Sequence, residues 1–430
     1  MMSAEGPYVA AIIARMPDAA YNLAAYGVAF ALAWLSESPI MMLLTASNTL
    51  VHDRSSFLAM RRFAYALVAM VTAFMIIAVS PPVFGYVTGT VMGLPPQVSA
   101  LLRVAMPLLI HWPGAIGYRR FYQGLLVRRR MTRRVAYGTV IRLASMSLTA
   151  AILALSTPLH GVTIAACALS SGVLAEAIVS RWMARHVVAA LLSEPAEAAP
   201  VPITQVSILR FYYPLAMTSM ISMVTGPILT FFMGRSRMPL ESLAALPVVQ
   251  NLVFSFRSGG VAFQEVGVAL SGRNHEHERE VGRAALFLAV VSSSALALML
   301  FTPLANLWFH GVSGLSADLA GFALFPAQLL VVLPAMEYWL SFQRSRFILN
   351  RQTRFVTIAT AIEVASLALV LAIGIGHFRM IGVVAGSAAM LAGRLSSNAF
   401  LFVARSMPPD PLLRDAPLHD RQHEMRSELG

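Results

Sequence analysis

Apolar and polar segments alternate along the whole chain. Nearly uninterrupted apolar runs occupy residues 67–79, 148–155, 284–304 and 359–375. A membrane-spanning helix needs about 20 mostly apolar residues, and several of these runs reach that length with their flanks. The runs lack the alternation of apolar and polar side chains that marks a transmembrane β-strand. The pattern therefore predicts an all-α polytopic membrane protein.

The apolar segments and the turn residues between them predict eleven long helices and one shorter helix. The long helices are expected at residues 20–50, 63–93, 99–127, 134–156, 160–190, 208–233, 240–271, 281–307, 316–343, 354–376 and 380–405, and the shorter one at 6–16. Six helices fall on each side of residues 193–204, a polar and proline-rich stretch that is typical of a linker.

Composition supports this class and explains the net charge of +12. The chain is 57% hydrophobic and 12% charged, and all 32 of its basic residues are arginine. One alternating set of loops, with the tail, holds 24 arginines and the other set holds five. Because basic loops stay in the cytoplasm, we expect a bacterial inner-membrane protein with both termini cytoplasmic. The charge therefore gives no reason to expect a nucleic-acid partner, although the arginines between residues 119 and 134 would also suit anionic lipid headgroups.

An internal repeat relates the two halves of the chain. Gly6-Pro7 matches Gly226-Pro227 and Leu23-Ala24-Ala25 matches Leu243-Ala244-Ala245, all at an offset of 220. The same offset relates Tyr118 and Gln123 to Tyr338 and Gln343. Each half has an even number of helices, so both halves insert in the same direction, as two parallel six-helix repeats. Parallel repeats of this kind occur in transporters, with the substrate path between the halves.

The repeat sets the expected domain boundaries. They are a first six-helix half at 1–192, a cytoplasmic linker at 193–207, a second six-helix half at 208–405 and a disordered tail at 406–430. In the second half a helical stretch from Ile208 to Val224 precedes Thr225, whereas only the stretch from Met1 to Ala4 precedes the equivalent Glu5. We therefore expect 12 transmembrane helices with a truncated first helix, through a misassigned start codon or a clipped chain.

Eight ionisable side chains fall at membrane depth. Each costs at least about 2.5 kcal/mol to insert, so each is a candidate functional residue. They are Glu37, Arg142, Glu176, Arg257, Glu265, Glu337, Glu363 and Arg394. Glu265 and Glu337 lie near the cytoplasmic ends of their helices, where solvation at the interface is expected. Glu176 and Arg394 lie on the sixth helices, about one turn from equivalent positions.

The repeat places opposite charges at equivalent positions. Glu37 is equivalent to Arg257 at an offset of 220, and Arg142 is equivalent to Glu363 at 221. We predict that each pair lines a central path from opposite sides. Arginine suits a carboxylate or phosphate group of a substrate, and a carboxylate in a low dielectric can carry a proton. The alternative is structural, with ion pairs that hold helices together.

The openings of the two halves point to a family. Each half begins with a helix and a short turn, followed by LAAYG or LAALP at the start of a long second helix. This organisation resembles the multidrug and toxin extrusion (MATE) transporters, whose superfamily includes flippases for polysaccharides and lipid-linked oligosaccharides. The segments LAAYGVAFAL, SPIMMLLTASNTLVHDR and FYYPLAMTSMISMVTGPI are most similar to the progressive ankylosis branch. The resemblance covers nearly the whole chain and implies a V-shaped fold with alternating access through a central cavity.

The resemblance also implies coupling to a proton or sodium gradient. MATE-like proteins commonly carry an acidic residue in the first helix, and Glu5 stands near that place with glutamate instead of the usual aspartate. The chain has no phosphate-binding glycine loop, no metal-spaced His/Cys set and no nucleophile elbow. We therefore expect neither an enzyme nor an ATP-driven pump, and no cofactor other than the coupling ion.

Three classes of function stay open. The first is a secondary transporter for a small solute, such as an organic anion or, as in a multidrug:cation antiporter, a drug. The second is a flippase for a lipid-linked oligosaccharide, which would also use a cationic cavity. The third is a membrane scaffold that does not transport. In each case we expect a monomer in contact with membrane lipids.

Overall fold

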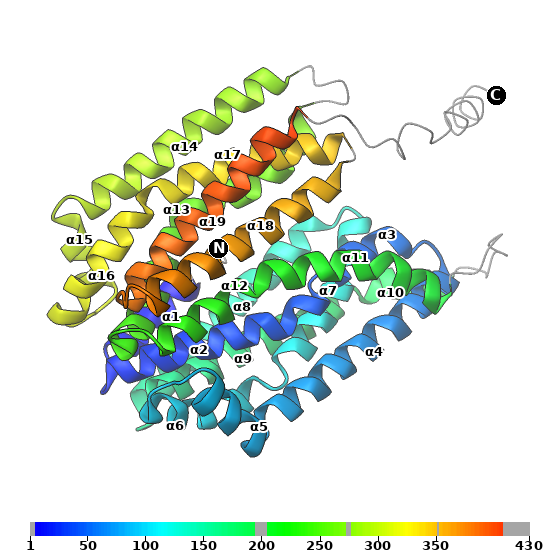
Figure 1. Ribbon diagram of the computed structural model, residues 1–430. Coiled ribbons are helices and arrows are strands. Elements are labelled where there is room, and N and C mark those ends of the chain that lie inside the picture. The colour runs from blue at the N-terminus through cyan, green and yellow to red at the C-terminus, as the bar shows by residue number, and fades with distance from the viewer. Residues whose placement is uncertain (1–4, 194–203, 272–276, 351, 407–430) are drawn as a thin grey trace.

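The computed structural model describes residues 5–193, 204–271, 277–350 and 352–406 of the 430-residue chain. Within these ranges the chain forms helices joined by turns, with one isolated bridge between Arg237 and Ile381. Figure 1 shows two groups of helices that are close at one end and diverge toward the other. The prediction of an all-α fold is confirmed.

The helices follow the same order in both halves. The first half contains α1 (Glu5–Ala14), α2 (Ala19–Glu37), η2 (Ser38–Ile40), α3 (Leu43–Leu50), α4 (Arg54–Val79), α5 (Pro81–Gly85), η3 (Tyr86–Val91), α6 (Pro96–Ala105), η4 (Met106–Leu109), α7 (Trp112–Arg128), α8 (Thr132–Ser156), α9 (Gly161–Met183) and α10 (Arg185–Ser193). The second half contains α11 (Gln205–Met223), α12 (Thr225–Gly234), α13 (Pro239–Leu270), α14 (Glu278–Leu300), α15 (Leu304–Asn306), η5 (Leu307–Val312), α16 (Ala317–Leu329), η6 (Leu330–Val332), α17 (Leu333–Leu349), α18 (Thr353–Gly376) and α19 (Gly382–Ala404).

The structural repeat keeps the register that the sequence predicts. The helices α9 and α19 begin and end at equivalent positions of the repeat, as do the π-helical turns η3 and η5. Backbone exceptions repeat as well. Asp18 and Met238 both have a left-handed conformation before the second long helix of their half, and Gly93 and Gly314 have one after the π-helical turns.

Within the described residues, ten helical segments are long and apolar enough to cross a membrane. The two remaining members of the twelve-helix pattern are α19, with 23 residues, and the short α1, with ten. Each of these has its counterpart in the other half, since α19 matches α9 and α1 matches α12. The chain is therefore a multi-pass membrane protein.

The helix predicted at residues 63–93 is wrong in both its start and its continuity. It begins earlier, because the Asp53 side chain accepts a hydrogen bond from the Ser56 amide at 2.7 Å and caps α4. This bond holds the pKa of Asp53 below its usual value. Pro81 and Pro82 then follow Ser80, and since proline has no amide hydrogen the helix ends there and restarts as α5 and η3.

Small residues form the interface between the halves. The helix α2 packs along α13 and α12, and α1 also packs on α13. The repeated Leu-Ala-Ala segments that begin at Leu23 and Leu243 are fully buried, and they lie on α2 and α13. A methyl group on Gly27 would lie 3.3 Å from the ring of Pro247, which is its own repeat equivalent. An approximate two-fold axis therefore passes through the contact of Gly27 with Pro247. Close packing of small residues, as at this contact, is a common way in which membrane helices associate.

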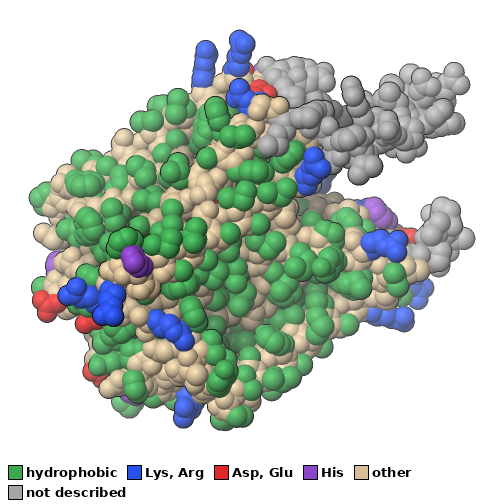
Figure 2. Space-filling view, in the orientation of Figure 1, with side chains coloured by type: hydrophobic (Ala, Val, Ile, Leu, Met, Phe, Trp, Pro, Cys, Tyr) green, Lys and Arg blue, Asp and Glu red, His purple; other side chains and the backbone are tan. Residues whose placement is uncertain are grey.

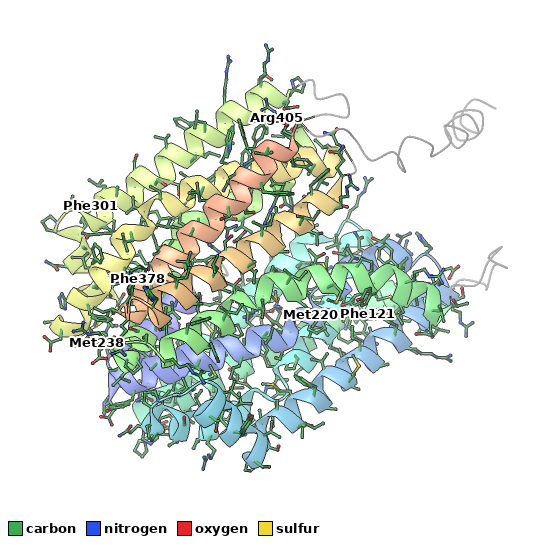
Figure 3. All side chains as sticks on the ribbon, in the orientation of Figure 1. Phe121, Met220, Met238, Phe301, Phe378 and Arg405 are labelled. Carbon is green, nitrogen blue, oxygen red and sulfur yellow. The ribbon has the colours of Figure 1, made fainter. Side chains whose placement is uncertain are left out.

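The halves are joined at one end only. Met238 and Phe378 lie toward the joined end and Arg405 lies at the opposite end (Figure 3). Figure 2 shows the surface hollowed between the two halves at that opposite end. The V shape implied by the resemblance to MATE transporters is therefore present.

The helix α11 connects the two halves along one side. Its residues pack on η2 and α4 of the first half and on α18 of the second half. The Tyr212 hydroxyl donates to the carbonyl of Pro39, and the Gln205 side-chain amide donates to the carbonyl of Ala59 at 2.9 Å.

One close glycine contact gives a test of the fold. A methyl group on Gly393 of α19 would lie 2.7 Å from the Glu363 carbonyl oxygen of α18, and the equivalent Gly172 lies similarly close to the carbonyl of Arg142. We expect Gly393→Ala to lower stability by about 1–3 kcal/mol, because two helix backbones must separate. Gly321→Ala is the control, since nothing lies within 4 Å of that position. Thermal unfolding in detergent would contradict the packing if both variants were equally stable.

Candidate substrate and ion pathway

Glu176 is the centre of a buried charged cluster in the first half. Its carboxylate accepts hydrogen bonds from Arg119 and, at 3.0 Å, from Gln123, and it lies 3.7 Å from Arg142. Arg142 in turn donates to Glu5 at 2.7 Å. Residues of α1, α7, α8 and α9 are thus tied together, so that charges buried among apolar helices compensate one another.

Glu37 lies at the edge of this cluster with a different set of contacts. The Trp112 indole donates to its carboxylate at 3.2 Å, and the same ring lies under the Arg142 guanidinium. Glu37 is buried, yet it forms no salt bridge within 4.0 Å among the described residues. Arg120, nearby on α7, contacts the Met41 sulfur at 3.4 Å instead of a carboxylate. We call Glu5, Glu37, Arg119, Arg120, Arg142 and Glu176 the first-half cluster.

Glu337 is the centre of an equivalent cluster in the second half. It lies 3.6 Å from Arg257 and 3.2 Å from Arg394. Arg394 also lies 3.2 Å from Glu363, which is 3.7 Å from Arg344. We call these five residues the second-half cluster. Its members lie on α13, α17, α18 and α19, whose repeat equivalents include the helices α7, α8 and α9 of the first cluster.

The two clusters share a scaffold but differ in charge and exposure. Gln123 donates to Glu176, and its repeat equivalent Gln343 donates to Asn398 at 2.8 Å, so both link the fourth and sixth helices of their half. The first-half cluster has three glutamates for three arginines, whereas the second has two for three. The side chain of Arg257 is 21% exposed and those of Arg344 and Glu363 are 18% exposed. The second-half cluster therefore has an excess of positive charge that reaches the surface.

The structure places the predicted site residues in two groups. Glu5, Glu37, Arg142 and Glu176 belong to the first-half cluster, and Arg257, Glu363 and Arg394 belong to the second. In the described residues each arginine of these groups that forms a salt bridge does so with a glutamate of its own half. The repeat-related pairs Glu37 with Arg257 and Arg142 with Glu363 are therefore not partners of each other.

Sequence reasoning missed several members of these clusters. Arg119, Arg120 and Arg344 are among the 24 arginines that the charge pattern assigns to cytoplasmic loops and the tail, although the predicted helix at 99–127 contains the first two. Glu337 was expected at the interface, but it is buried between two arginines, so that expectation was wrong. The signal that could have found them is the repeat, because Tyr118 and Gln123 flank Arg119 and Arg120, and the equivalent Tyr338 and Gln343 are the chain neighbours of Glu337 and Arg344.

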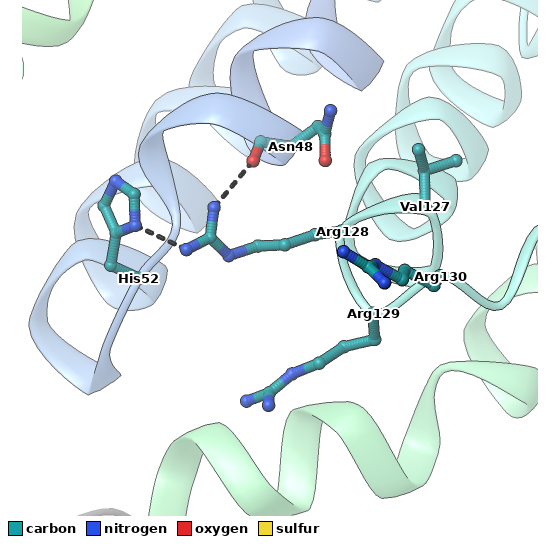
Figure 4. Close-up of a pocket in the computed structure, with 6 residues that line it drawn as sticks. All are labelled: Asn48, His52, Val127, Arg128, Arg129 and Arg130. Atoms are coloured by element: carbon teal, nitrogen blue, oxygen red, sulfur yellow. Dashed lines mark hydrogen bonds between the residues drawn. The ribbon is translucent and has the colours of Figure 1, made fainter. Parts of the chain in front are cut away.

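A separate pocket lies at the ends of α3 and α7, outside the two clusters. It has a volume of about 630 Å³ and is lined by Asn48, His52, Val127, Arg128, Arg129 and Arg130 (Figure 4). The Arg128 guanidinium donates to the carbonyl of Asn48 at 3.0 Å and contacts the ring of His52. This pocket belongs to the arginine-rich stretch that the sequence associates with topology or with lipid headgroups.

Comparison with known proteins identifies the architecture. The chain matches no protein-family model and no curated protein. It is similar to the solved structure of a multidrug resistance MATE family transporter of the MOP superfamily in an inward-facing conformation, with a TM-score of 0.72 and 13% identity over 94% of each chain. The chain has the MATE transporter fold.

Two further solved structures show how widely this fold is shared. The lipid II flippase MurJ, in an inward closed conformation, aligns with a TM-score of 0.68 and 13% identity over 94% of this chain and 86% of MurJ. A MOP superfamily transporter from Pyrococcus furiosus aligns with a TM-score of 0.57 and 14% identity over 94% of this chain and 90% of the other. These likenesses do not distinguish the progressive ankylosis branch, which stays a prediction.

Glu176 gives a test of the first-half cluster. We expect Glu176→Gln to destabilise the protein by about 3–5 kcal/mol, because Arg119 would remain buried without its counter-charge. Glu265→Gln is the matched control, since Glu265 is exposed. Thermal unfolding of both purified variants measures the difference. Equal unfolding temperatures would show that the cluster does not hold the helices together.

Proposed function

We propose that the chain is a secondary transporter that moves an organic anion across the membrane by alternating access between its two halves. The observation on which this rests is the second-half cluster, where three arginines face two glutamates and part of the set is exposed. The MATE transporter fold supports a transport function, because structures similar to this chain are transporters of that fold.

The distribution of ion pairs supports movement of the halves as rigid bodies. The salt bridges within the clusters link helices of one half, so they are preserved when the halves move apart. The interface between the halves instead includes close contacts of small residues, Gly27 with Pro247 and Gly226 with Ala31, which can shift without leaving a charge unpaired. A transporter whose two repeats move around a fixed site needs strong contacts within each repeat and weaker contacts between the repeats.

Arginine chemistry favours an anionic substrate group. A guanidinium presents a planar fork that binds a carboxylate or phosphate through two hydrogen bonds. Arg257 and Arg344 are each 3.6–3.7 Å from a glutamate, a distance that leaves their donors incompletely used. An incoming anion would complete those hydrogen bonds and balance the third arginine of the cluster.

Glu37 is the proposed coupling site. It is a buried carboxylate that is held by a neutral indole, whereas Glu176 is held by arginine. A proton is the smallest cation that can neutralise such a group, and binding it changes the charge of the first-half cluster by one. We therefore propose a proton as the coupling ion, with sodium as the alternative that the fold also allows.

Orientation is part of the proposal. The Arg128–Arg130 stretch and Arg405 lie at the ends of helices that lead to the open side of the molecule, where the linker between the halves also begins. Since arginine-rich loops face the cytoplasm, we propose that the hollow opens inward and that the ends of α10 and α19 lie on the cytoplasmic side of the bacterial inner membrane.

A flippase for a lipid-linked oligosaccharide is the second candidate. The likeness to MurJ over 94% of this chain supports it, and a phosphate-linked lipid would use the same arginines. The Pyrococcus furiosus transporter is described as having a binding pocket of reverse polarity, so the polarity of the binding pocket differs among proteins of this fold. Proteoliposomes that translocate a lipid-linked sugar but not soluble anions would favour this candidate.

The anion site is tested by Arg257→Gln and Arg344→Gln. We expect each variant to lower the uptake of labelled di- and tricarboxylates into proteoliposomes about tenfold or more, because a charged hydrogen bond to the substrate is lost. Glu337 keeps Arg394 as a partner in Arg257→Gln, so the fold should be retained. Arg103→Gln, which removes an exposed arginine elsewhere, should transport normally. Full activity of both site variants would reject the assignment.

The coupling site is tested by Glu37→Gln. We expect this variant to bind substrate and exchange it across the membrane, yet to lose accumulation driven by a pH gradient, because the amide cannot take up a proton. Uptake with and without an imposed pH gradient, and again with a sodium gradient, measures this. Accumulation that still follows the pH gradient in Glu37→Gln would place coupling on another residue.

A further inference from the structure

Two arginines cross between the halves at their joined end. Arg235, in the turn between α12 and α13, reaches the first half and donates to the carbonyls of Val91 and, at 2.9 Å, Thr90. Arg15, in the turn between α1 and α2, reaches the second half and donates to the carbonyls of Gly311 at 2.6 Å and Val312 at 2.9 Å. The contacts are reciprocal, because each half supplies one arginine and one acceptor site.

The repeat shows that these are one contact made twice. Arg15 is equivalent to Arg235 at the offset of 220, and the acceptors Thr90 and Val91 are equivalent to Gly311 and Val312 at 221. The approximate two-fold axis that relates the halves therefore also relates the two contacts. This symmetry indicates that the two contacts are one repeated structural feature and are not incidental surface hydrogen bonds.

Each acceptor site is the end of a π-helical turn. The carbonyls lie in the last two residues of η3 or η5, where the helix leaves acceptors without amide partners of its own. Gly93 and Gly314 follow in left-handed conformations and turn the chain away, which opens those carbonyls to the arginine. Gly314 has a φ of +72°, which favours glycine, and a methyl group there would lie 2.9 Å from the Arg15 side chain and displace it.

Each arginine is also fixed from its own half. Arg15 donates to the carbonyl of Ala11 at 2.7 Å, and the Arg235 guanidinium lies 4.3 Å from the centre of the Phe231 ring. Ala11 and Phe231 are repeat equivalents. The two guanidinium groups are therefore held in place before they meet the opposite half, which lowers the entropy that each contact costs.

We infer that Arg15 and Arg235 form a reciprocal latch that holds the joined end of the molecule closed, and that both contacts must break when that end opens. The inference rests on the proposed function in assuming that the joined end opens. The acceptors are uncharged backbone carbonyls, so the latch itself contains no carboxylate that could take up a proton. The pH gradient would act through the first-half cluster, and the latch would set how much the closed state is favoured.

The latch is tested by spin labels on Val83→Cys and Leu304→Cys in a Cys167→Ser background. These positions are repeat equivalents, are 39% and 45% exposed, and lie on α5 and α15 next to the acceptor turns. In full-length protein reconstituted without substrate, we expect Arg15→Gln with Arg235→Gln to increase the population with a long label separation roughly tenfold or more, and each single variant to have a smaller effect.

Two controls make the result specific. Arg103→Gln removes an exposed arginine that makes no hydrogen bond to the second half among the described residues, and it should leave the distance distribution unchanged. Arg15→Lys with Arg235→Lys keeps both charges but loses the planar fork, so it should fold normally and give an intermediate population.

The outcomes separate the latch from the proposed transport. The latch would be overturned if the double glutamine variant had the same distance distribution as Arg103→Gln. If the glutamine variants failed to fold, the double lysine variant would decide, and a distance distribution identical to that of the unsubstituted protein would overturn the latch. If the distances shift as expected while no variant transports any tested anion, the latch stands and the proposed substrate is wrong.

Discussion

The buried salt bridges within each half are the interaction on which the rest of the structure depends. Glu176 with Arg119 and Arg142, and Glu337 with Arg257 and Arg394, place full charges among apolar helices. Such charges are tolerated only while their partners stay in place, because an uncompensated charge in this environment is strongly destabilising. Each cluster therefore fixes three or four helices of its half relative to one another, and relative movement is confined to the interface between the halves.

That interface is built for movement in a different way. It includes close contacts of small residues around Gly27 and Pro247, and at the joined end the hydrogen bonds of Arg15 and Arg235 to carbonyl groups. Contacts between an exposed arginine and a backbone carbonyl can exchange with water at modest cost, whereas the buried salt bridges cannot. The molecule thus has strong connections inside each half and weaker, symmetric connections between the halves.

Much of the fold could be predicted from the sequence, because hydrophobic length and the internal repeat are properties of the chain itself. The repeat predicted the register of equivalent helices closely, as the matching ends of α9 and α19 show. The charged clusters were predictable only in part. Glu37 and Arg257 were recognised from the repeat, but their contacts with Trp112 and Glu337 depend on helix rotation, which apolar composition does not specify. Arg119 and Arg344 were missed because an arginine near a helix end looks like a topology signal until its neighbours are known.

The most direct test of this account is whether each half moves as one body. Spin labels on Ser55→Cys and Glu280→Cys report the distance between the halves at the open end. Labels on Ser55→Cys and Thr132→Cys report a distance within the first half. All three positions are exposed. Electron spin resonance in proteoliposomes, with and without a pH gradient and transported anion, compares the two pairs. If the halves move as rigid bodies, the pair between halves should show two populations whose proportions change with conditions, and the pair within the half should show a single unchanged population. A change within the half, or a single fixed distance for both pairs, would contradict it.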